Sequence, residues 1–586
     1  MELDIIIVTY NSASWIEGCL DSLSRVRYPK HNLNLFFVDN GSSDLTTEKL
    51  EQEMKRRQDV FGSMRIISNK RNVGFGAANN IGANAGKSEF IFFLNVDTEI
   101  TEEALANASD VIERSDNDVA AWELRQFPYE HPKLYDPLTL STSWISGAAF
   151  IIRRAVFQEV GGFDSSIFMY AEDVDLSWRI RAKGYRLLYM PSCIVYHYSY
   201  SEKNEIKPRQ FIYSLINNLN LRVRYGSFLH VSFWHIKFLY ILLRGNGAHV
   251  SRKKLTAAYL RNLFKVPSFF SWRLKKLKPT FAGWDYEVAR TGGFYTNFIQ
   301  VDYKPLVSIL VRTIGRVDIL REALTSIRNQ TYKNIEVVVV EDGGRVSEKL
   351  IQEEFCDLHI VYLSTDQKVG RSKAANLAMD AAKGPFLNFL DDDDLLFPDH
   401  VEVLVNELSH RTHDVVYAVA FEVPTEYMAD RRKINHEYKV VFNNGFNRLK
   451  LMYQNYLPIQ CVMFKKELVK DKIYFDEKMD ALEDWDFWMR LALETDFRAV
   501  DKTTSMYRVP YHSAQVQSRQ QVLDSAIAYV REKQKKYYSR VNGYEVANDV
   551  MDLLGQNKLN SMKSKNKWLY YFYRAASKML NKINHS

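Results

Sequence analysis

Cysteine is scarce in this sequence, with four residues among 586, and all four lie far apart. They form neither a CxxC pair nor a cluster with histidine, which argues against a disulfide framework or a cysteine-based zinc site. Long apolar runs are also missing. The most apolar segment, 228–243, contains two histidines and a lysine and is shorter than the roughly 20 residues that cross a bilayer. Because acids stand where a signal peptide carries basic residues, we expect a cytoplasmic protein without a membrane-crossing segment.

Charge and apolar content indicate a large folded protein with little excess charge. Apolar residues make up 46% of the chain and aromatic residues 13%, which is enough for extensive packed cores. A length of 586 residues exceeds what one hydrophobic core usually serves, so two or more domains are expected. The net charge of +7 is mild for this length and does not by itself indicate nucleic acid as a partner.

A repeat lies within the chain. The block 72–100, which ends in "FIFFLNVDTEI", matches the block 368–396, which ends in "FLNFLDDDDLL". A constant offset of 296 positions (368 − 72) pairs Asp97 with Asp393 without a gap. Other elements recur in the same order: apolar strands at 4–11 and 307–313, strands ending in acid and glycine at 33–44 and 335–344, and acidic helix starts at 169–184 and 480–494.

Strands that alternate with helical stretches predict βαβ units and a mostly parallel sheet. Their near-continuous Val, Ile and Phe runs are typical of a sheet covered on both faces. The predicted fold class is therefore α/β, with two tandem copies of one Rossmann-like domain. The predicted segments are a first domain at 1–225, a helical connector at 226–303, a second domain at 304–515 and a helical, basic and aromatic tail at 516–586.

Acids gather where strands end in both copies. In an open parallel sheet, ligands bind beyond the carboxyl ends of the strands. Asp391, Asp393 and Asp394 offer hard oxygen ligands that suit Mg²⁺ or Mn²⁺, and such an ion would hold phosphate oxygens. Strand-end acids also serve as turn or N-cap residues, and for Asp97 alone this alternative is open.

A second pair of acids begins each of two predicted helices. Glu172 and Asp173 stand at one helix start, and Glu483 and Asp484 stand at the other. Carboxylates there interact favourably with the helix dipole, which is a purely structural explanation. The functional interpretation is a general base that takes a proton from a hydroxyl near the strand-end acids. We favour it because the pair recurs at the same place in both copies.

The ordered set of motifs resembles the inverting nucleotide-sugar transferases of glycosyltransferase family 2, with the GT-A fold. In the first half the resemblance rests on IIIVTYNSASWIEGCLDSL, FFVDNGSSD, NVGFGAANNIG, LNVDTEI, ISGAAFIIRRAVFQEVGGFD and YAEDVDLSWRIRAKG. In the second half it rests on the strand through Thr313, SIRNQTYKNIEVVVVEDGG, FLDDDDLLFPDH and EDWDFWMRL. The first half is similar to the rhamnosyltransferase-like branch, in which the metal motif often reads Asn-x-Asp.

The resemblance implies a role for each matching residue. Asp173 and Asp484 would be the catalytic bases, with Glu172 and Glu483 as close alternatives. Residues that would bind the nucleotide sugar are Thr9, Asp39, Asn80 and Asp97 in the first half and Thr313, Glu341, Asp342, Arg371, Lys373, Asp391 and Asp392 in the second. A solvated surface role is equally open for Arg371 and Lys373, two basic residues that the first copy lacks.

A divalent cation, Mn²⁺ or Mg²⁺, is the implied cofactor. Its ligands would be Asp97, His197, Asp391, Asp393 and His512. His512 matches less well than His197 because Pro510 stands where the family motif places histidine, and a structural role for either histidine is open. Asn95 replaces the first metal-site carboxylate of the first half, which predicts weaker metal binding there.

Aromatic residues point to acceptor and membrane contacts. Trp144 and Trp485 could stack on sugar rings of the acceptor, and core packing would explain them equally well. The segment 558–586 has no acid and combines Lys and Arg with five aromatic residues in 568–573. Such a tail could lie on the inner face of the cell membrane. Packing on the second domain or in a dimer interface is the alternative.

The resulting hypothesis is a bifunctional, metal-dependent, inverting transferase. It would move sugars from UDP- or dTDP-linked donors onto a lipid-linked or growing bacterial surface polysaccharide, of the O-antigen or capsule type, in one or two linkages. One working site beside a degenerate acceptor-binding copy is an alternative, and so is a non-catalytic glycan-binding scaffold. Nucleic acid is not an expected partner because the basic residues are spread out and the predicted sites are acidic.

Overall fold

The structure is a computed structural model. The residues that it describes are 1–199, 207–244, 250–273, 289–293, 304–410, 413–428, 433–469, 473–538, 543 and 546–547. By its internal contacts the chain divides into two compact units. Unit 1 is built on Met1–Ala289, and unit 2 holds the described residues from 304 onward.

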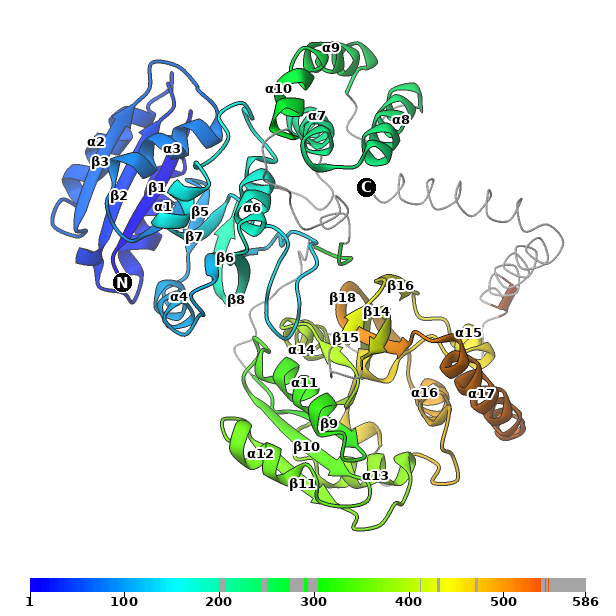
Figure 1. The fold of residues 1–586 in the computed structure, drawn as a ribbon. Coiled ribbons are helices and arrows are strands. Elements are labelled where there is room, and N and C mark those ends of the chain that lie inside the picture. Colours follow the sequence, from blue (N-terminus) through cyan, green and yellow to red (C-terminus); the bar gives the residue numbers. More distant parts are fainter. Residues whose placement is uncertain are drawn as a thin grey trace. The chain divides into compact units, whose positions relative to one another are not determined.

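Unit 1 is a sheet of eight strands with helices on both faces (Figure 1). The strands are β1 (Leu3–Thr9), β2 (Leu33–Asp39), β3 (Ser63–Ser68), β4 (Phe90–Leu94), β5 (Thr98–Ile100), β6 (Val119–Phe127), β7 (Ala149–Arg153) and β8 (Arg186–His197). The helices on the sheet are α1 (Ile16–Arg25), α2 (Thr46–Arg56), α3 (Phe75–Ala85), α4 (Ala104–Glu113), α5 (Arg154–Glu159) and α6 (Glu172–Ala182). Alternate residues of β1 point to two cores: Ile5 and Ile7 pack with α1, α2 and α4, whereas Ile6 packs with α3, α5 and α6.

Unit 2 repeats this architecture. Its strands are β9 (Val307–Thr313), β10 (Ile335–Glu341), β11 (Ile360–Ser364), β12 (Phe386–Asp391), β13 (Leu395–Leu396), β14 (Val415–Tyr427), β15 (Lys433–Asn435), β16 (Lys439–Phe442), β17 (Val462–Lys465) and β18 (Phe497–Pro510). Its helices are α11 (Val317–Arg328), α12 (Glu348–Glu354), α13 (Arg371–Ala381), α14 (His400–His410), α15 (Arg448–Tyr453), α16 (Glu483–Glu494) and α17 (Ser513–Gln534).

The two sheets have the same strand order. It is β3-β2-β1-β4-β7-β6-β8-β5 in unit 1 and β11-β10-β9-β12-β17-β14-β18-β13 in unit 2, where β15 and β16 also pair with β14. In each sheet the first four strands are parallel. Antiparallel contacts follow, and β6 with β8, or β14 with β18, forms a further parallel pair. The predicted α/β class and the tandem repeat are confirmed.

Four more helices of unit 1 follow its sheet. They are α7 (Pro208–Tyr225), α8 (Phe228–Arg244), α9 (Arg252–Leu263) and α10 (Val266–Arg273). Asp175 fixes α7 to α6, because its carboxylate accepts hydrogen bonds from Arg224 at 2.6 Å and Tyr225 at 2.7 Å. Arg179 of α6 donates to the same carboxylate at 2.9 Å. The third acid of this helix start is therefore a structural anchor.

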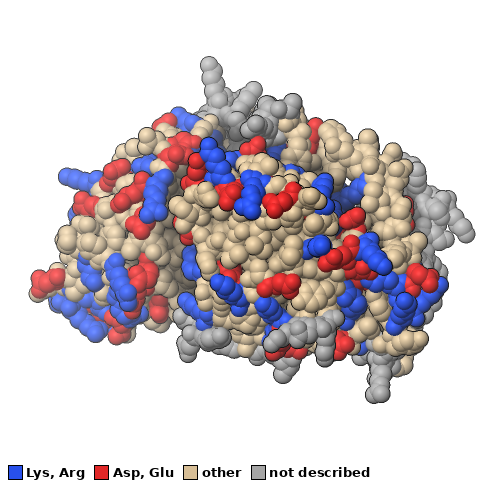
Figure 2. All heavy atoms as spheres, turned by 90° about the horizontal axis from the view of Figure 1, so that it is seen from below, with Lys and Arg blue, Asp and Glu red and all other residues tan. Residues whose placement is uncertain are grey.

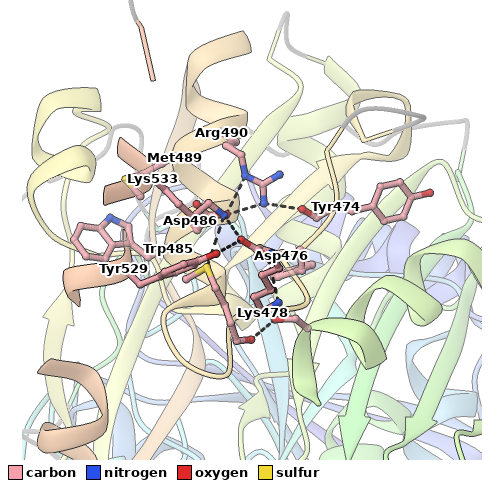
Figure 3. Close-up of polar contacts among 12 residues, drawn as sticks. Tyr474, Asp476, Lys478, Trp485, Asp486, Met489, Arg490, Tyr529 and Lys533 are labelled. Carbon is pink, nitrogen blue, oxygen red and sulfur yellow. Dashed lines mark hydrogen bonds and ion pairs between the residues drawn. The ribbon is translucent and has the colours of Figure 1, made fainter. Parts of the chain in front are cut away.

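Asp486 is the corresponding anchor of unit 2. Figure 3 shows Arg490 of α16 and Lys533 of α17 converging on its carboxylate, with distances of 3.0 and 2.9 Å. Tyr537 donates to it at 2.6 Å. Helix α17 is thus fixed to α16, and the boundary predicted after residue 515 falls inside a helix that begins at Ser513. The four predicted segment limits stay predictions, and residues 558–586 lie outside the described part of the chain.

The surface carries charges of both signs. Figure 2 shows Lys and Arg interspersed with Asp and Glu on the face that it presents. Within the residues that the structure covers, no helix combines the length and the apolar character needed to cross a membrane. A basic patch of the kind that nucleic acid binds is not seen on the face drawn in Figure 2.

Candidate active site

In unit 1 the end of the sheet brings Asp97 against His197. Strand β5 pairs with β8 so that Thr98 stands opposite His197. This register places Nε2 of His197 at 3.4 Å from Oδ1 of Asp97. The Ser199 hydroxyl donates to Oδ2 of Asp97 over 3.3 Å and lies 2.7 Å from the same imidazole nitrogen. Two residues that are far apart in sequence thus share one polar cluster.

The charge of Asp97 suits a ligand of a cation. Burial raises the pKa of its carboxyl, but the hydrogen bond and charge of His197 outweigh burial, and the pKa lies below its ordinary value. The other ring nitrogen of His197, Nδ1, lies 2.7 Å from Oε1 of Gln126. This contact holds the imidazole in the orientation that faces Asp97.

Asp173 stands at the first turn of α6. The helix begins after Ala171, whose φ of +73° lies in the left-handed region and turns the chain into the helix. The backbone N–H of Gly147 donates to Oδ2 of Asp173 over 2.9 Å, and that of Val174 donates to Oδ1 over 2.8 Å. Burial raises the pKa of Asp173 above its ordinary value. A raised pKa makes a carboxylate a better proton acceptor.

One short backbone segment joins the strand end to the helix start. Gly147 donates to Asp173, and the next residue, Ala148, accepts from the N–H of Asn95 over 2.8 Å. Asn95 directly follows β4 and lies two positions before Asp97. The two acids that the sequence singled out in the first half therefore lie at the same edge of the sheet.

Sequence reasoning missed Lys133, whose charge acts on Asp173, and His131, which packs against Trp144. Lys133 is buried, and its ammonium group contacts Glu123 and the carbonyl of Trp144, the latter at 3.2 Å. Its charge lowers the pKa of Asp173 and offsets part of the effect of burial. His131 packs edge-on against Trp144 with a ring-centroid distance of 5.4 Å. Both residues lie in a long connection without periodic pattern, so no local signal marked them.

In unit 2 a buried arginine joins the strand end to the helix start. Arg312 of β9 donates to both oxygens of Asp391, at 2.8 and 2.9 Å, and to Glu483 of α16 at 3.0 Å. The guanidinium group is 7% exposed. Such a bidentate pair is strong and directional. The signal for it was a charged residue inside an otherwise apolar strand, VSILVRT, which the sequence analysis did not use.

A second arginine binds the next two acids. Arg316 donates to both oxygens of Asp392 and, at 3.1 Å, to Asp393. Thr313 also donates to Asp392, at 2.7 Å. Burial raises the pKa of Asp392 to about 6, although Arg316 opposes this shift. Asp394 is fully buried and accepts from the backbone N–H of Arg508. Asp393 and Asp391 are the more exposed acids of the four, at 36% and 28%.

Asp484 resembles Asp173 in its surroundings. Its Oδ2 accepts from the side-chain amide of Asn455 at 3.0 Å, and its Oδ1 accepts from the N–H of Trp485 at 2.8 Å. Burial, followed by the charge of Glu483, raises the pKa of Asp484 to about 7, while Arg312 acts in the opposite direction. The carboxyl therefore changes its charge near neutral pH.

The two units differ in the buried charges at the strand end. Val8 precedes Thr9 in β1 as Arg312 precedes Thr313 in β9, so unit 1 lacks the buried arginine. Asn95 stands where unit 2 has Asp391, which removes one negative charge together with the positive one. Within the described residues, Oδ1 of Asn95 and Oε2 of Glu172 are buried without a hydrogen-bond partner.

Among the residues that the structure describes, Glu172 has no buried arginine beside it of the kind that binds Glu483 in unit 2. Burial, together with the charge of Asp173, raises the pKa of Glu172 well above its ordinary value. The raised pKa favours the protonated form of Glu172, which does not accept a proton, whereas Glu483 is bound to Arg312 at 3.0 Å. In both units this arrangement favours the second acid of the pair, Asp173 or Asp484, as the proton acceptor.

Comparison with known proteins identifies the family of both units. The model of glycosyl transferase family 2 matches residues 4–176 and again 308–472, once in each unit and more than half of the chain in total. The chain belongs to glycosyl transferase family 2. The two units are accordingly tandem transferase domains of the GT-A fold. The model of glycosyl transferase family group 2 also matches residues 91–277.

Relatives of this family 2 chain include bacterial glycosyltransferases. An uncharacterized glycosyltransferase of Rickettsia felis is 24% identical over 535 residues, which cover 86% of this chain and 79% of that protein. The N-acetylglucosaminyl-diphospho-decaprenol L-rhamnosyltransferase of Mycobacterium tuberculosis is 27% identical over 242 residues, or 33% of this chain and 76% of that protein. A solved structure, mannosyltransferase PcManGT from Pyrobaculum calidifontis in complex with GDP-Man and Mn²⁺, has 17% identity and a TM-score of 0.33, covering 47% of this chain and 84% of that one.

In each unit, the acids predicted to contact the nucleotide form hydrogen bonds within the loops that surround them. Asp39 accepts from Thr9 at 3.2 Å and from the N–H of Ser42 at 3.1 Å. Glu341 accepts from two backbone N–H groups of the loop after β10, and Asp342 accepts from the N–H groups that precede α13. These bonds give the loops their shape. Direct contact of the three acids and of Thr9 and Thr313 with a nucleotide stays a prediction.

Asn80 has a structural role, and its contact with the sugar nucleotide stays a prediction. Its side-chain amide donates to the carbonyl of Phe163 at 2.8 Å and accepts from the N–H of the same residue at 2.9 Å. Asn376 makes the same pair of bonds with Phe475, at 3.0 and 2.8 Å. In both transferase domains this amide joins a helix to a distant loop, and these two bonds leave Asn80 a second N–H and a second oxygen lone pair.

Two further predicted residues of unit 2 make other contacts in the structure, and their site roles stay predictions. His512 is more than half exposed, and its Nε2 lies 3.2 Å from Glu426 and not at the strand-end acids. The pairing of Leu395 with Met506 places Tyr507 opposite Asp394, where the equivalent pair of unit 1 is His197 opposite Thr98. Trp485 is buried in the core and donates its indole N–H to the carbonyl of Leu451, which favours the core-packing alternative.

Three other residues predicted to bind the donor or the acceptor lie near the site or at the surface beside it. Arg371 lies at the start of α13, 3.7 Å from Glu483, and is more than half exposed. Lys373 is exposed on the same helix. Trp144 is half-buried between His131 and Lys133. Roles of these three residues in donor or acceptor binding stay predictions.

The donor set of unit 1 fits a divalent cation. Asp97 and His197 lie side by side, and the orphaned Oδ1 of Asn95 is a further oxygen donor at the same strand end. In unit 2 both oxygens of Asp391 accept hydrogen bonds from Arg312, and the metal-ligand roles of Asp391 and Asp393 stay predictions. The described residues contain no group of three or more His, Cys, Asp and Glu arranged to hold an ion by themselves.

Proposed function

We propose that this protein is a bifunctional, metal-dependent, inverting glycosyltransferase. Its two sites move sugars from UDP- or dTDP-linked donors onto a lipid-linked or growing bacterial surface polysaccharide, of the O-antigen or capsule type. The observation that carries this proposal is the joining of each strand-end acid to a helix-start acid at one edge of the sheet. Gly147 and Ala148 make that connection in unit 1, and Arg312 makes it in unit 2.

The arrangement supports a single in-line displacement. Asp173, or Asp484, accepts the proton of the acceptor hydroxyl, which attacks the anomeric carbon as the bond to the nucleoside diphosphate breaks. A divalent cation, which Asp97 and His197 would hold in unit 1 and Asp391 and Asp393 in unit 2, would supply charge that stabilises the departing diphosphate. Because the attack comes from the face opposite the leaving group, the configuration at the sugar inverts.

A panel of nucleotide sugars tests the proposal. Full-length protein with Mn²⁺ or Mg²⁺ is assayed for release of nucleoside diphosphate and for linkages in the product. Release without any added acceptor beyond water, or no release with any donor of the panel, contradicts the transferase function. Glycan binding without such release favours the non-catalytic scaffold. If inactivating one unit abolishes all release of nucleoside diphosphate, the alternative with a degenerate second copy is favoured.

Metal dependence should change at one site when its aspartate is replaced. Asp97→Asn removes one negative charge from the cation site, so the Mn²⁺ concentration for half-maximal transfer by unit 1 should rise by about 10–100-fold. The measurement is a Mn²⁺ titration of diphosphate release in a chain whose unit 2 carries Asp484→Asn. The matched control is Asp116→Asn, which changes an exposed acid bound to Arg186. An equal midpoint for Asp97→Asn and the control contradicts the assignment.

The pH profile of unit 2 should report Asp484. Its pKa is raised to about 7, so the carboxyl is protonated below that pH and cannot accept a proton. Transfer by unit 2, measured as kcat/KM in an Asp173→Asn background, should therefore fall about tenfold per pH unit below pH 7. Arg312→Met removes a charge that lowers this pKa, so it should move the limb to higher pH. A profile that is flat between pH 5 and 8, or an unmoved limb, contradicts the role of Asp484.

A further inference from the structure

Helix α8 has an apolar face that the core of unit 1 does not use. Its large apolar side chains Phe228, Leu229, Phe233, Ile236, Leu239 and Leu243 are between 41% and 80% exposed. At about 100° per residue these six positions fall within one arc of about 140° of the helix. An exposed stripe of this size on one helix is unusual for a surface that faces only water.

The opposite face of α8 already has its packing partners. Trp234 and Phe238 are buried and lie outside the exposed arc. They belong to a small core that they share with Leu215 and Leu219 of α7 and Leu255 of α9. The exposed stripe is therefore not needed to hold the helices α7 to α10 together, which leaves it available for a partner.

The surroundings of the stripe are basic. The segment 206–284 contains fifteen Lys and Arg and none of the 71 acids of the chain. Lys237 and Arg244 stand at the border of the exposed arc, at about 180° and 160° from Phe228. The end of α9 adds Leu260 and Phe264, both more than half exposed, after an exposed basic start.

We propose that this face of α8, with the exposed end of α9, docks on an anionic lipid surface. The apolar stripe would enter the boundary between headgroups and acyl chains, while the flanking cations contact lipid phosphates. A second copy of this chain fits less well, because the cations that flank the stripe, Lys237 and Arg244, would repel their counterparts. Lipid binding by this face does not depend on transferase activity, so it can hold even if the proposed function fails.

Vesicle flotation of the full-length protein tests the docking surface. The probes are vesicles of phosphatidylcholine alone and of phosphatidylcholine with phosphatidylglycerol. We expect binding to the anionic vesicles that weakens as NaCl is raised. The double variant Ile236→Glu/Leu243→Glu should lower the bound partition coefficient by at least about tenfold. The matched control, Leu45→Glu/Val522→Glu, places the same charges on exposed apolar positions elsewhere and should bind as the unsubstituted protein does.

Several outcomes overturn the proposal. One is unchanged binding of the α8 variant while Trp568→Glu/Phe572→Glu abolishes it, which assigns docking to the segment 558–586. Another is a dimer that the α8 variant converts to monomer without any vesicle binding by the unsubstituted protein. Equal circular dichroism and melting of both double variants shows that the comparison concerns a folded protein. Diphosphate release in solution, measured in parallel, separates failure of docking from failure of the proposed function.

Discussion

Asp173→Asn should lower transfer by unit 1 about 10²–10⁴-fold, and Asp484→Asn should do the same for unit 2. Asparagine has nearly the same shape and keeps one of the two hydrogen bonds that each carboxylate accepts. It cannot take up the proton of an acceptor hydroxyl. Diphosphate release with acceptor present is the measurement, and nucleotide affinity should change little because neither residue is expected to touch the nucleotide.

The neighbouring glutamate distinguishes which acid of unit 1 is the base. Glu172 is buried and its pKa is raised, so Glu172→Gln resembles the protonated form that this shift favours. We expect it to lower transfer by less than about tenfold. A loss with Glu172→Gln as large as that with Asp173→Asn would mean that Glu172 takes part in proton transfer. Full activity of Asp173→Asn and Asp484→Asn would remove the helix-start acids from the mechanism.

Arg312→Met should destabilise unit 2 by about 3–5 kcal/mol. Arg312 is the cation bound to Asp391 and Glu483, and the glutamate side chain is 4% exposed. Methionine fills a similar volume but leaves buried carboxylates without the partner that offsets their loss of hydration. Urea unfolding at neutral pH, followed by tryptophan fluorescence of the full-length protein, measures the change in the free energy of unfolding.

The residues that unit 1 has at the two positions provide the matched control. Arg312→Val/Asp391→Asn reproduces Val8 and Asn95, so one buried negative charge disappears together with the positive one. This double variant should be more stable than Arg312→Val alone, by roughly 1–3 kcal/mol, because only Glu483 then lacks its partner. If the double variant is as unstable as the single one, Arg312 stabilises unit 2 by packing and not by charge.

Much of the fold could be predicted because it is encoded locally. Apolar runs such as those of β1 and β9 predict buried strands, and their alternation with helical segments predicts a parallel sheet. The same holds for the acids at the ends of β4 and β12, since the strands that carry them end at one edge. The offset between the two halves then predicted identical strand order, which both sheets have.

Individual contacts of the site were less predictable. The sequence indicated His197 and His512 by similar short motifs, yet only His197 reaches a strand-end acid. Asn80 is a predicted ligand group within a repeated motif, and its amide bonds to the backbone of Phe163, a residue of another loop. Arg312 looked like one more residue of a strand. In each case the partner lies far away in sequence.

The sequence by itself therefore determined the two α/β domains, the edge of each sheet where the acids gather and the candidate bases at the helix starts. Only the tertiary structure decided which acids are bound by arginine, which histidine faces an aspartate and which apolar face of α8 is exposed. The physical reason is that the apolar patterns of strands and helices repeat over a few residues and reflect which residues are buried. Pairing between distant side chains depends instead on strand register and loop paths, which no local pattern specifies.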